Sequence, residues 1–144
     1  MNRKNCQVGF TLVEVLLAVI FVGLALASLV AGNRAFTQAN AIANEMSTAE
    51  FLTEQIRERT RLAFFENLDD DDFEGTYSPP IDAKGDPLPD FAAYRQKVTV
   101  GYVENTDFTK ETNSTSRFKK IKVEIYRGTR KISETSWIRA QMKP

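Results

Sequence analysis

A single carboxylate, that of Glu14, lies inside an apolar run of 23 residues that extends from Phe10 to Gly32. An ionised side chain at the centre of a bilayer costs about 2.5–3.5 kcal/mol on insertion scales, and less near an interface. Two interpretations follow, and the residues alone leave both open. Glu14 either lies close enough to the headgroups to stay solvated, or it pairs with a cation in an assembly, because an acid inside a membrane segment is a candidate functional site.

The apolar run is long enough to carry Glu14 into a membrane. As a helix that rises about 1.5 Å per residue, Phe10–Gly32 would span roughly 34 Å, against a hydrocarbon core of about 30 Å. The uncharged part after the acid, residues 15–31, has 17 residues, which is the short end of the spanning range. Arg3 and Lys4 precede the run, so the positive-inside rule predicts a cytoplasmic N-terminus and places the chain after Gly32 outside the cytoplasm.

The residues around Gly9 carry a resemblance to a known family. A basic leader, then Gly-Phe-Thr-Leu-Val-Glu-Val-Leu-Leu-Ala from Gly9 on, then an apolar helix, resembles the signature of type IV prepilins and type II secretion pseudopilins. The match extends from Arg3 to about Val30. The resemblance implies that a prepilin peptidase cuts between Gly9 and Phe10 and methylates the new Phe10 amine. It also implies that Glu14 meets the terminal amine of a neighbouring subunit as subunits stack.

The physical character of the segment fits such processing. Glycine leaves room for a protease to approach the backbone, and the cut would free a cation four residues before Glu14. An ordinary secretory signal places its apolar region before the cleavage site. Here the apolar region follows Gly9, so residues 1–9 would leave as a leader and residues 10–32 would stay as a transmembrane helix. Desolvation offsets much of the attraction in a buried ion pair, so we expect the pair to set register more than to add stability.

The only cysteine of the chain, Cys6, lies in the expected leader. No small-residue lipobox surrounds it, which argues against a lipidation site. The mature chain would then lack a disulfide, unlike the many type IV pilins that close a C-terminal loop with a cysteine pair. Cleavage also removes Arg3 and Lys4, which leaves 17 of the 19 bases against 19 acids, a formal charge of −2.

A helical pattern with a different apolar face continues through residues 33–66. Apolar and small residues recur there at steps of three and four. They are Ala35, Ala39, Ile42, Met46, Ala49, Leu52 and Ile56. No proline interrupts residues 10–78, so we expect one helix from about Phe10 to Glu66, about 85 Å long at roughly 1.5 Å per residue. Its amphipathic half should pack under the head formed by residues 67–144, because so few residues rarely build an independent core.

Residues 67–90 are acidic and rich in proline. They carry eight acids against one base, Lys84, which gives a charge of −7 and predicts a long exposed loop. Its clearest feature is a run of four acids: Asp69, Asp70, Asp71 and Asp72. Carboxylate oxygens are ligands that Ca²⁺ prefers, but the spacing matches no EF-hand and charge runs are usually solvated. We therefore predict no metal or other cofactor, with calcium at this run as the alternative.

Alternation of apolar and polar residues predicts strands in the last part of the chain. The strands are expected at about 97–102, at 118–126 and at 131–139, and a short turn at 127–130 makes the last two antiparallel. Their apolar members are Val98, Val100, Tyr102, Ile121, Val123, Ile125, Ile132, Trp137 and Ile138. The prediction is thus an α+β, pilin-like fold, with one long N-terminal helix packed under a small antiparallel sheet of three to four strands.

Residues 91–144 carry twelve bases and five acids, a charge of +7. The bases expected on the outer face of the sheet are Lys119, Lys120, Lys122, Arg127, Arg130 and Lys131. They could contact phosphates, and such binding would weaken steeply with salt. The alternative is that the solvated face of the sheet is rich in lysine and protects the sheet edge from pairing. The acidic loop of the same subunit, or of the next one, would neutralise this face. We favour the second interpretation and do not expect nucleic-acid binding.

Catalysis finds no support in the sequence. The chain has no histidine, no cysteine after the leader, no glycine-rich phosphate loop and no serine in a nucleophile-like context. The small size and retained Glu14 look most like a minor subunit, an I-type pseudopilin or a V-type minor pilin. That resemblance implies a single-pass protein of the bacterial inner membrane with a periplasmic head. Its partners would be the prepilin peptidase, other pilins or pseudopilins and the assembly platform. A filament-associated module that binds secreted substrate or DNA is the alternative, and a membrane-anchored domain that never polymerises is another.

Overall fold

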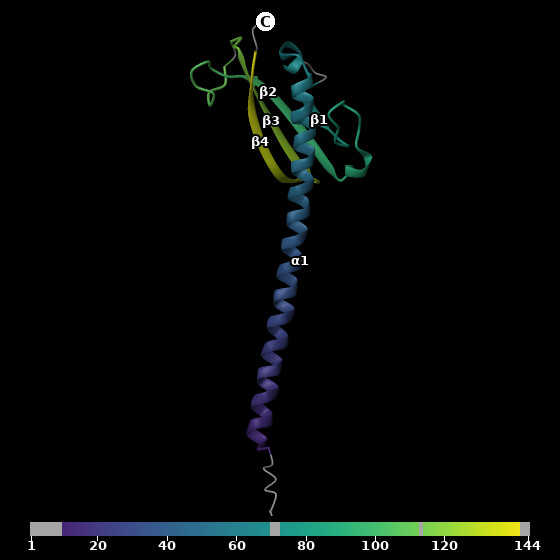
Figure 1. Ribbon diagram of the computed structural model, residues 1–144, viewed down its shortest axis with the longest axis vertical. Helices are drawn as coiled ribbons and strands as arrows, with labels where there is room; N and C mark the ends of the chain where they lie inside the picture. Colours follow the sequence, from purple (N-terminus) through teal and green to yellow (C-terminus); the bar gives the residue numbers. More distant parts are fainter. Residues whose placement is uncertain (1–9, 70–72, 113, 142–144) are drawn as a thin grey trace, which may run out of the picture. The chain divides into compact units, whose positions relative to one another are not determined.

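The computed structural model describes residues 10–69, 73–112 and 114–141. The chain divides into two compact units, Met1–Ile42 and Ala43–Pro144. In the described residues the regular elements are one long helix, two short 3-10 helices and four strands (Figure 1). The fold class is α+β, and the arrangement of one long N-terminal helix with an antiparallel sheet is pilin-like, which confirms the predicted fold.

Helix α1 extends from Leu12 to Leu62. Thr11 precedes it, and the amide of Glu14 donates to the Thr11 side-chain oxygen at 3.3 Å, which satisfies one of the free donors of the first turn. The predicted end at Glu66 is four residues too late. After Leu62 the chain tightens into the 3-10 helix η1, Phe65–Asp69. Leu68, in this short helix, is fully buried, so packing into the head ends α1.

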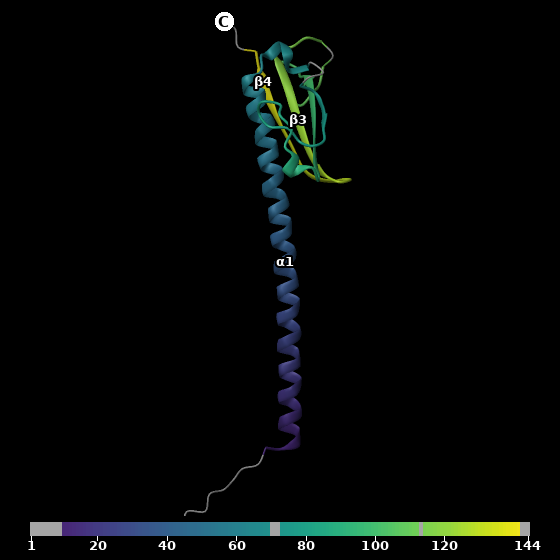
Figure 2. The same cartoon turned by 90° about the vertical axis from the view of Figure 1, so that its right-hand side faces the viewer.

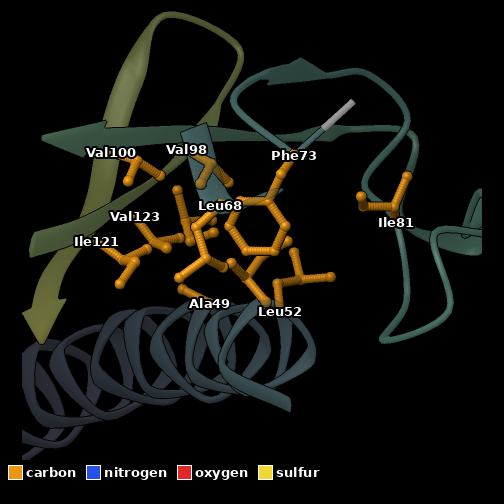
Figure 3. Packing of buried hydrophobic residues seen from close by; sticks show 11 residues of the cluster. Ala49, Leu52, Leu68, Phe73, Ile81, Val98, Val100, Ile121 and Val123 are labelled. Atoms are coloured by element: carbon orange, nitrogen blue, oxygen red, sulfur yellow. The ribbon is translucent and has the colours of Figure 1, made fainter. Parts of the chain in front are cut away.

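The head unit has its core between the C-terminal part of α1 and the sheet. Ala49, Leu52 and Ile56 of the helix are at most 1% exposed. They belong to one cluster with Val98, Val100, Ile121, Val123 and Ile125 of the strands. Figure 3 shows Ala49 and Leu52 directed from the helix toward the strand residues. Thr53 and Thr60 are also buried, and their hydroxyls donate at 2.8 Å to the carbonyls of Ala49 and Ile56. The core therefore holds no unsatisfied hydroxyl on this face.

The predicted apolar stripe on the helix is correct only in its last part. Ala35, Ala39 and Ile42 are exposed, and Met46 is 58% exposed. The periodicity specifies which side chains share a helix face, but it does not specify how far along the helix the sheet extends. The expectation that the whole stripe packs within the chain was wrong.

The sheet has the order β1-β2-β3-β4, with neighbouring strands antiparallel (Figures 1 and 2). The strands are β1 Gly75–Tyr77, β2 Tyr94–Tyr102, β3 Phe118–Arg127 and β4 Arg130–Ala140. The predicted tight turn between β3 and β4 is confirmed. Gly128 in that turn has φ +59°, a left-handed conformation that glycine adopts at little cost. A bulge follows where Ile125 pairs with Ser133 and Tyr126 pairs with Lys131.

The segment 67–90 is more than the exposed loop that its composition predicted. It supplies β1, which pairs with β2 from Gly75↔Val98 to Tyr77↔Gln96. It also buries Leu68, Phe73 and Ile81 in the head core. The three apolar residues are far apart in the sequence among acids and prolines, so no periodic pattern marked them.

Gln96 links three parts of the head, and no sequence pattern predicted this role. Its side chain is fully buried on β2. The side-chain amide donates to the carbonyls of Leu52 at 2.9 Å and Ile81 at 3.2 Å, and its oxygen accepts from the Ile81 amide at 2.7 Å. A buried amide with these partners ties the helix, the 67–90 segment and the sheet together, because each partner would otherwise lose a hydrogen bond in the core.

Candidate functional site

The candidate site at the N-terminal end of α1 consists of Phe10 and Glu14. Phe10 is 80% exposed, and Glu14 lies in the first turn of the helix, where the helix dipole favours an anion. The two side chains line a shallow, mostly apolar depression together with Val15, Ala18, Val19 and Val22. Among the described residues Glu14 forms no ion pair within the chain. Gly9, the other half of the predicted cleavage site, lies outside the described residues.

The apolar segment that follows Glu14 has no cover from its own chain. None of the residues from Phe10 to Ile42 is buried, and the large apolar side chains of this segment are at least 42% exposed. Examples are Leu17 at 48%, Phe21 at 67% and Leu29 at 65%. The described part of the chain contains one helix that is long and apolar enough to cross a membrane, and it lies near the N-terminus. A solvent other than water, or another chain, must cover this surface.

The run of four acids lies almost entirely outside the described residues. The backbone of Asp69 belongs to η1, and Asp70, Asp71 and Asp72 lie outside the described residues. Within the part of the chain that the structure describes, histidine, cysteine and carboxylate side chains form no group of three or more that could hold a metal ion. Calcium at Asp69–Asp72 therefore stays an untested alternative.

Asp82, further along the same segment, supports its own loop. Its carboxylate accepts from the amides of Lys84 at 2.8 Å and Asp86 at 2.9 Å. The backbone hydrogen bond from Asp86 lowers the pKa of Asp82 despite some desolvation, and the amides of Lys84 and Gly85 act in the same direction. This carboxylate is thus occupied by the turn.

The predicted basic outer face is wrong at Lys119. This side chain is 1% exposed and points inward, like Ile121 two residues later. Its ammonium donates to the Phe65 carbonyl at 2.8 Å and lies over the rings of Phe65, at 4.7 Å, and Tyr102, at 5.0 Å. The sequence could have predicted this inward orientation. Alternate residues of a strand share a face, and Lys119 lies two residues before Ile121 in the same strand.

Arg127 and Arg130 are also engaged within the head. Both guanidinium groups bind the carboxylate of Glu45, a partly buried residue of α1, from the two sides of the β3–β4 turn. Desolvation acts to raise the pKa of Glu45, but the hydrogen bonds from Arg127 and Arg130 outweigh it and lower the pKa. Two arginine–glutamate ion pairs therefore connect the β3–β4 turn to α1.

The outer face of the sheet carries a network of alternating charge. Glu124 lies within 3.6 Å of Lys97, 3.8 Å of Lys122 and 3.4 Å of Lys131. Glu134 adds ion pairs with Lys122, at 3.0 Å, and with Lys131. The hydrogen bonds that both lysines donate to Glu134 raise the pKa of each lysine. Desolvation opposes ionisation of Glu124, yet Lys131 and Lys122 lower its pKa.

Most of the bases that were predicted on this face form ion pairs within the chain. Acids of the strands and of α1 form ion pairs with Lys122, Arg127, Arg130 and Lys131. Neutralisation by the 67–90 segment stays a prediction, since Asp70, Asp71 and Asp72 lie outside the described residues. Lys120 points outward and forms no ion pair among the described residues. Three acids, Glu45, Glu124 and Glu134, thus partner the paired bases, and a phosphate backbone would have to compete with them.

Comparison of the chain with protein-family models, with curated proteins and with solved structures finds no match.

Proposed function

We propose that this chain is a non-enzymatic minor subunit of a membrane-derived filament of the type IV pilus or type II secretion kind. In this proposal a prepilin peptidase removes residues 1–9, Phe10 becomes an N-methylated terminus, and residues 10–32 hold the subunit in the bacterial inner membrane until it joins the filament. The head, which includes residues 67–144, lies in the periplasm.

One observation carries the proposal: every residue of the apolar segment 10–32, which contains Glu14, is exposed, and Glu14 has no counter-ion in the described part of its own chain. An anion in an apolar surround needs a cation or water. A new amine at Phe10, four residues before the acid, would supply such a cation from a neighbouring subunit. The pair would then align adjacent helices along their axes.

No specific observation favours the alternative of DNA binding. Lys122, Arg127, Arg130 and Lys131 are paired with Glu45, Glu124 and Glu134, so phosphates would have to displace these acids.

The proposal is tested by mass spectrometry of the chain isolated from its native host. The expected result is a terminus at Phe10 with one added methyl group, and a chain with a bulky residue in place of Gly9 should keep Met1. A matched substitution at Leu12 keeps the cleaved bond unchanged and should still be processed. A wild-type chain that retains Met1, in a host with a working prepilin peptidase, would refute the proposal.

A further inference from the structure

The last strand of the sheet, β4, has an open edge. In the strand order β1-β2-β3-β4 it pairs with β3 on one side, and no other described strand lies on its second side (Figure 1). It is also the longest strand, with 11 residues. An open edge presents backbone donors and acceptors to which a further strand can bind.

Beside this edge lies a groove of about 410 Å³ in the head unit. It is lined from α1 by Met46, Glu50, Thr53, Glu54 and Arg57, and from β4 by Ile132, Ser133 and Thr135. A strand added next to β4 would lie about 4.8 Å from it and direct every second side chain toward this groove. The helix rises roughly 17 Å between Met46 and Arg57, which is about the length of five residues of extended chain.

The groove has an acid without an internal partner. Its lining carries two acids, Glu50 and Glu54, and one base, Arg57. Arg57 pairs with Glu54 at 3.0 Å and lies 5.2 Å over the ring of Trp137. Glu50 forms no ion pair in the described part of the chain, and it lies one helical turn before Glu54, an arrangement in which like charges repel. A cation that enters the groove next to Glu50 would relieve this repulsion.

A second copy of β4 does not fit the edge. The strand is basic at both ends, with Arg130 and Lys131 at one end and Arg139 at the other. Antiparallel pairing of two β4 strands about a two-fold axis brings the basic start of one next to the basic end of the other. Parallel pairing in register places Arg130 beside Arg130. Like charges directly opposite one another destabilise a strand pair, so the charge pattern selects against self-association at this edge.

We propose that β4 and the groove bind an extended segment of a different polypeptide, which adds to the sheet as a further strand and places a lysine or arginine side chain against Glu50. The small side chains of Ser133 and Thr135 leave room for apolar or small residues of that segment. This binding site belongs to the head and does not depend on the filament role of the N-terminal helix, so either proposal can fail without the other.

The test uses the full chain in detergent micelles and the synthetic peptide acetyl-Thr-Val-Thr-Lys-Thr-Val-Thr-amide, whose alternate residues present valine, lysine and valine to one face. Binding is followed by the fluorescence of Trp137, the only tryptophan. We expect saturable binding with a Kd below about 1 mM. The same peptide with glutamate in place of lysine should bind roughly fivefold more weakly, the upper range for a solvent-exposed ion pair.

Two comparisons separate this site from unspecific adsorption. In the Glu50→Lys variant the order of the two peptides should reverse, whereas Glu104→Lys, the same charge change on an exposed loop residue, should leave it unchanged. N-methylation of two adjacent peptide residues removes backbone donors on both edges of the added strand and should abolish binding. Equal binding of the lysine and glutamate peptides, undiminished binding of the N-methylated peptide, or no binding at about 1 mM would overturn the proposal.

Discussion

The two compact units differ in whether the chain covers its own apolar side chains, and Glu14 and Glu45 differ in whether the chain supplies a counter-ion. From Phe10 to Ile42 no residue is buried, and the one acid, Glu14, has no ion pair among the described residues. In the head, α1 buries five residues between Ala49 and Thr60, and Glu45 is held by two arginines. One helix thus uses its later residues to stabilise its own chain, while its earlier residues can be satisfied only by lipid or by another molecule.

The strongest test of this contrast is Glu14→Ala. On the proposed function, loss of the acid leaves a neighbour's terminal amine unpaired in lipid, and removal of one partner of a buried pair costs about 3–5 kcal/mol. We expect recovery of assembled filaments from the host to fall at least roughly a hundredfold, while the head keeps its stability. A variant that assembles and supports secretion like the parent would show that Glu14 has no role in assembly.

A pair of leucine substitutions compares the two units directly. Leu52→Ala opens a cavity in the head core, where Leu52 is fully buried, and should lower the free energy of unfolding of the head by about 2–5 kcal/mol. Leu17→Ala removes the same atoms from a side chain that is 48% exposed. It should change head stability by less than about 0.5 kcal/mol. Urea unfolding of the full chain in micelles, followed by Trp137 fluorescence, measures both, and similar losses would contradict the division between the units.

Within the head, substitutions of the adjacent residues Lys119 and Lys120 should have different effects on stability, because one side chain is buried and the other is not. Lys119→Ala removes the buried ammonium that donates to the Phe65 carbonyl, and hydrogen bonds to charged groups contribute about 1.5–3 kcal/mol. Lys120→Ala on the outer face should cost less than about 0.5 kcal/mol. The same urea experiment compares them. If the two variants unfold alike, the inward placement of Lys119 carries no stabilising contact.

The outer charge network predicts a smaller effect, which depends on pH. Glu124 and Glu134 have pKa values below their usual 4.5, so their contribution is complete above that value and is lost as pH falls through the lowered pKa. Lys122 and Lys131 have pKa values above 10.5, so their contribution is complete below that value and is lost as pH rises through the raised pKa.

We therefore expect a plateau of head stability near neutral pH, with losses at both ends. Glu124→Gln should reduce the loss on the acid side without removing it, because the pKa values of Glu45 and Asp82 are also lowered. Thermal unfolding of the full chain at several pH values measures this. If the variant lost as much stability at low pH as the parent, Glu124 would have the same pKa in the folded and the unfolded chain.

The sequence predicted the elements whose residues repeat with a regular period. Alternation in β2 and β3 identified Val98, Ile121 and Val123 as inward-facing residues, and all three are buried. It failed at Ile81 and in β1, because isolated apolar residues between acids and prolines have no period to detect. It also failed at Met46, because a period indicates which residues share a face and does not indicate how far the covering sheet extends.

By itself the sequence determined where an apolar helix begins, where its single acid lies and which stretches alternate as strands, since each depends on residues close together in the chain. Only the tertiary structure decided that Gln96 joins the helix to the sheet, that Lys119 reaches Phe65 and that Glu45 meets two arginines. These partners lie 44, 54 and more than 80 positions apart. Contacts of that kind arise when the chain folds back on itself, and no local pattern encodes which distant residue will be there.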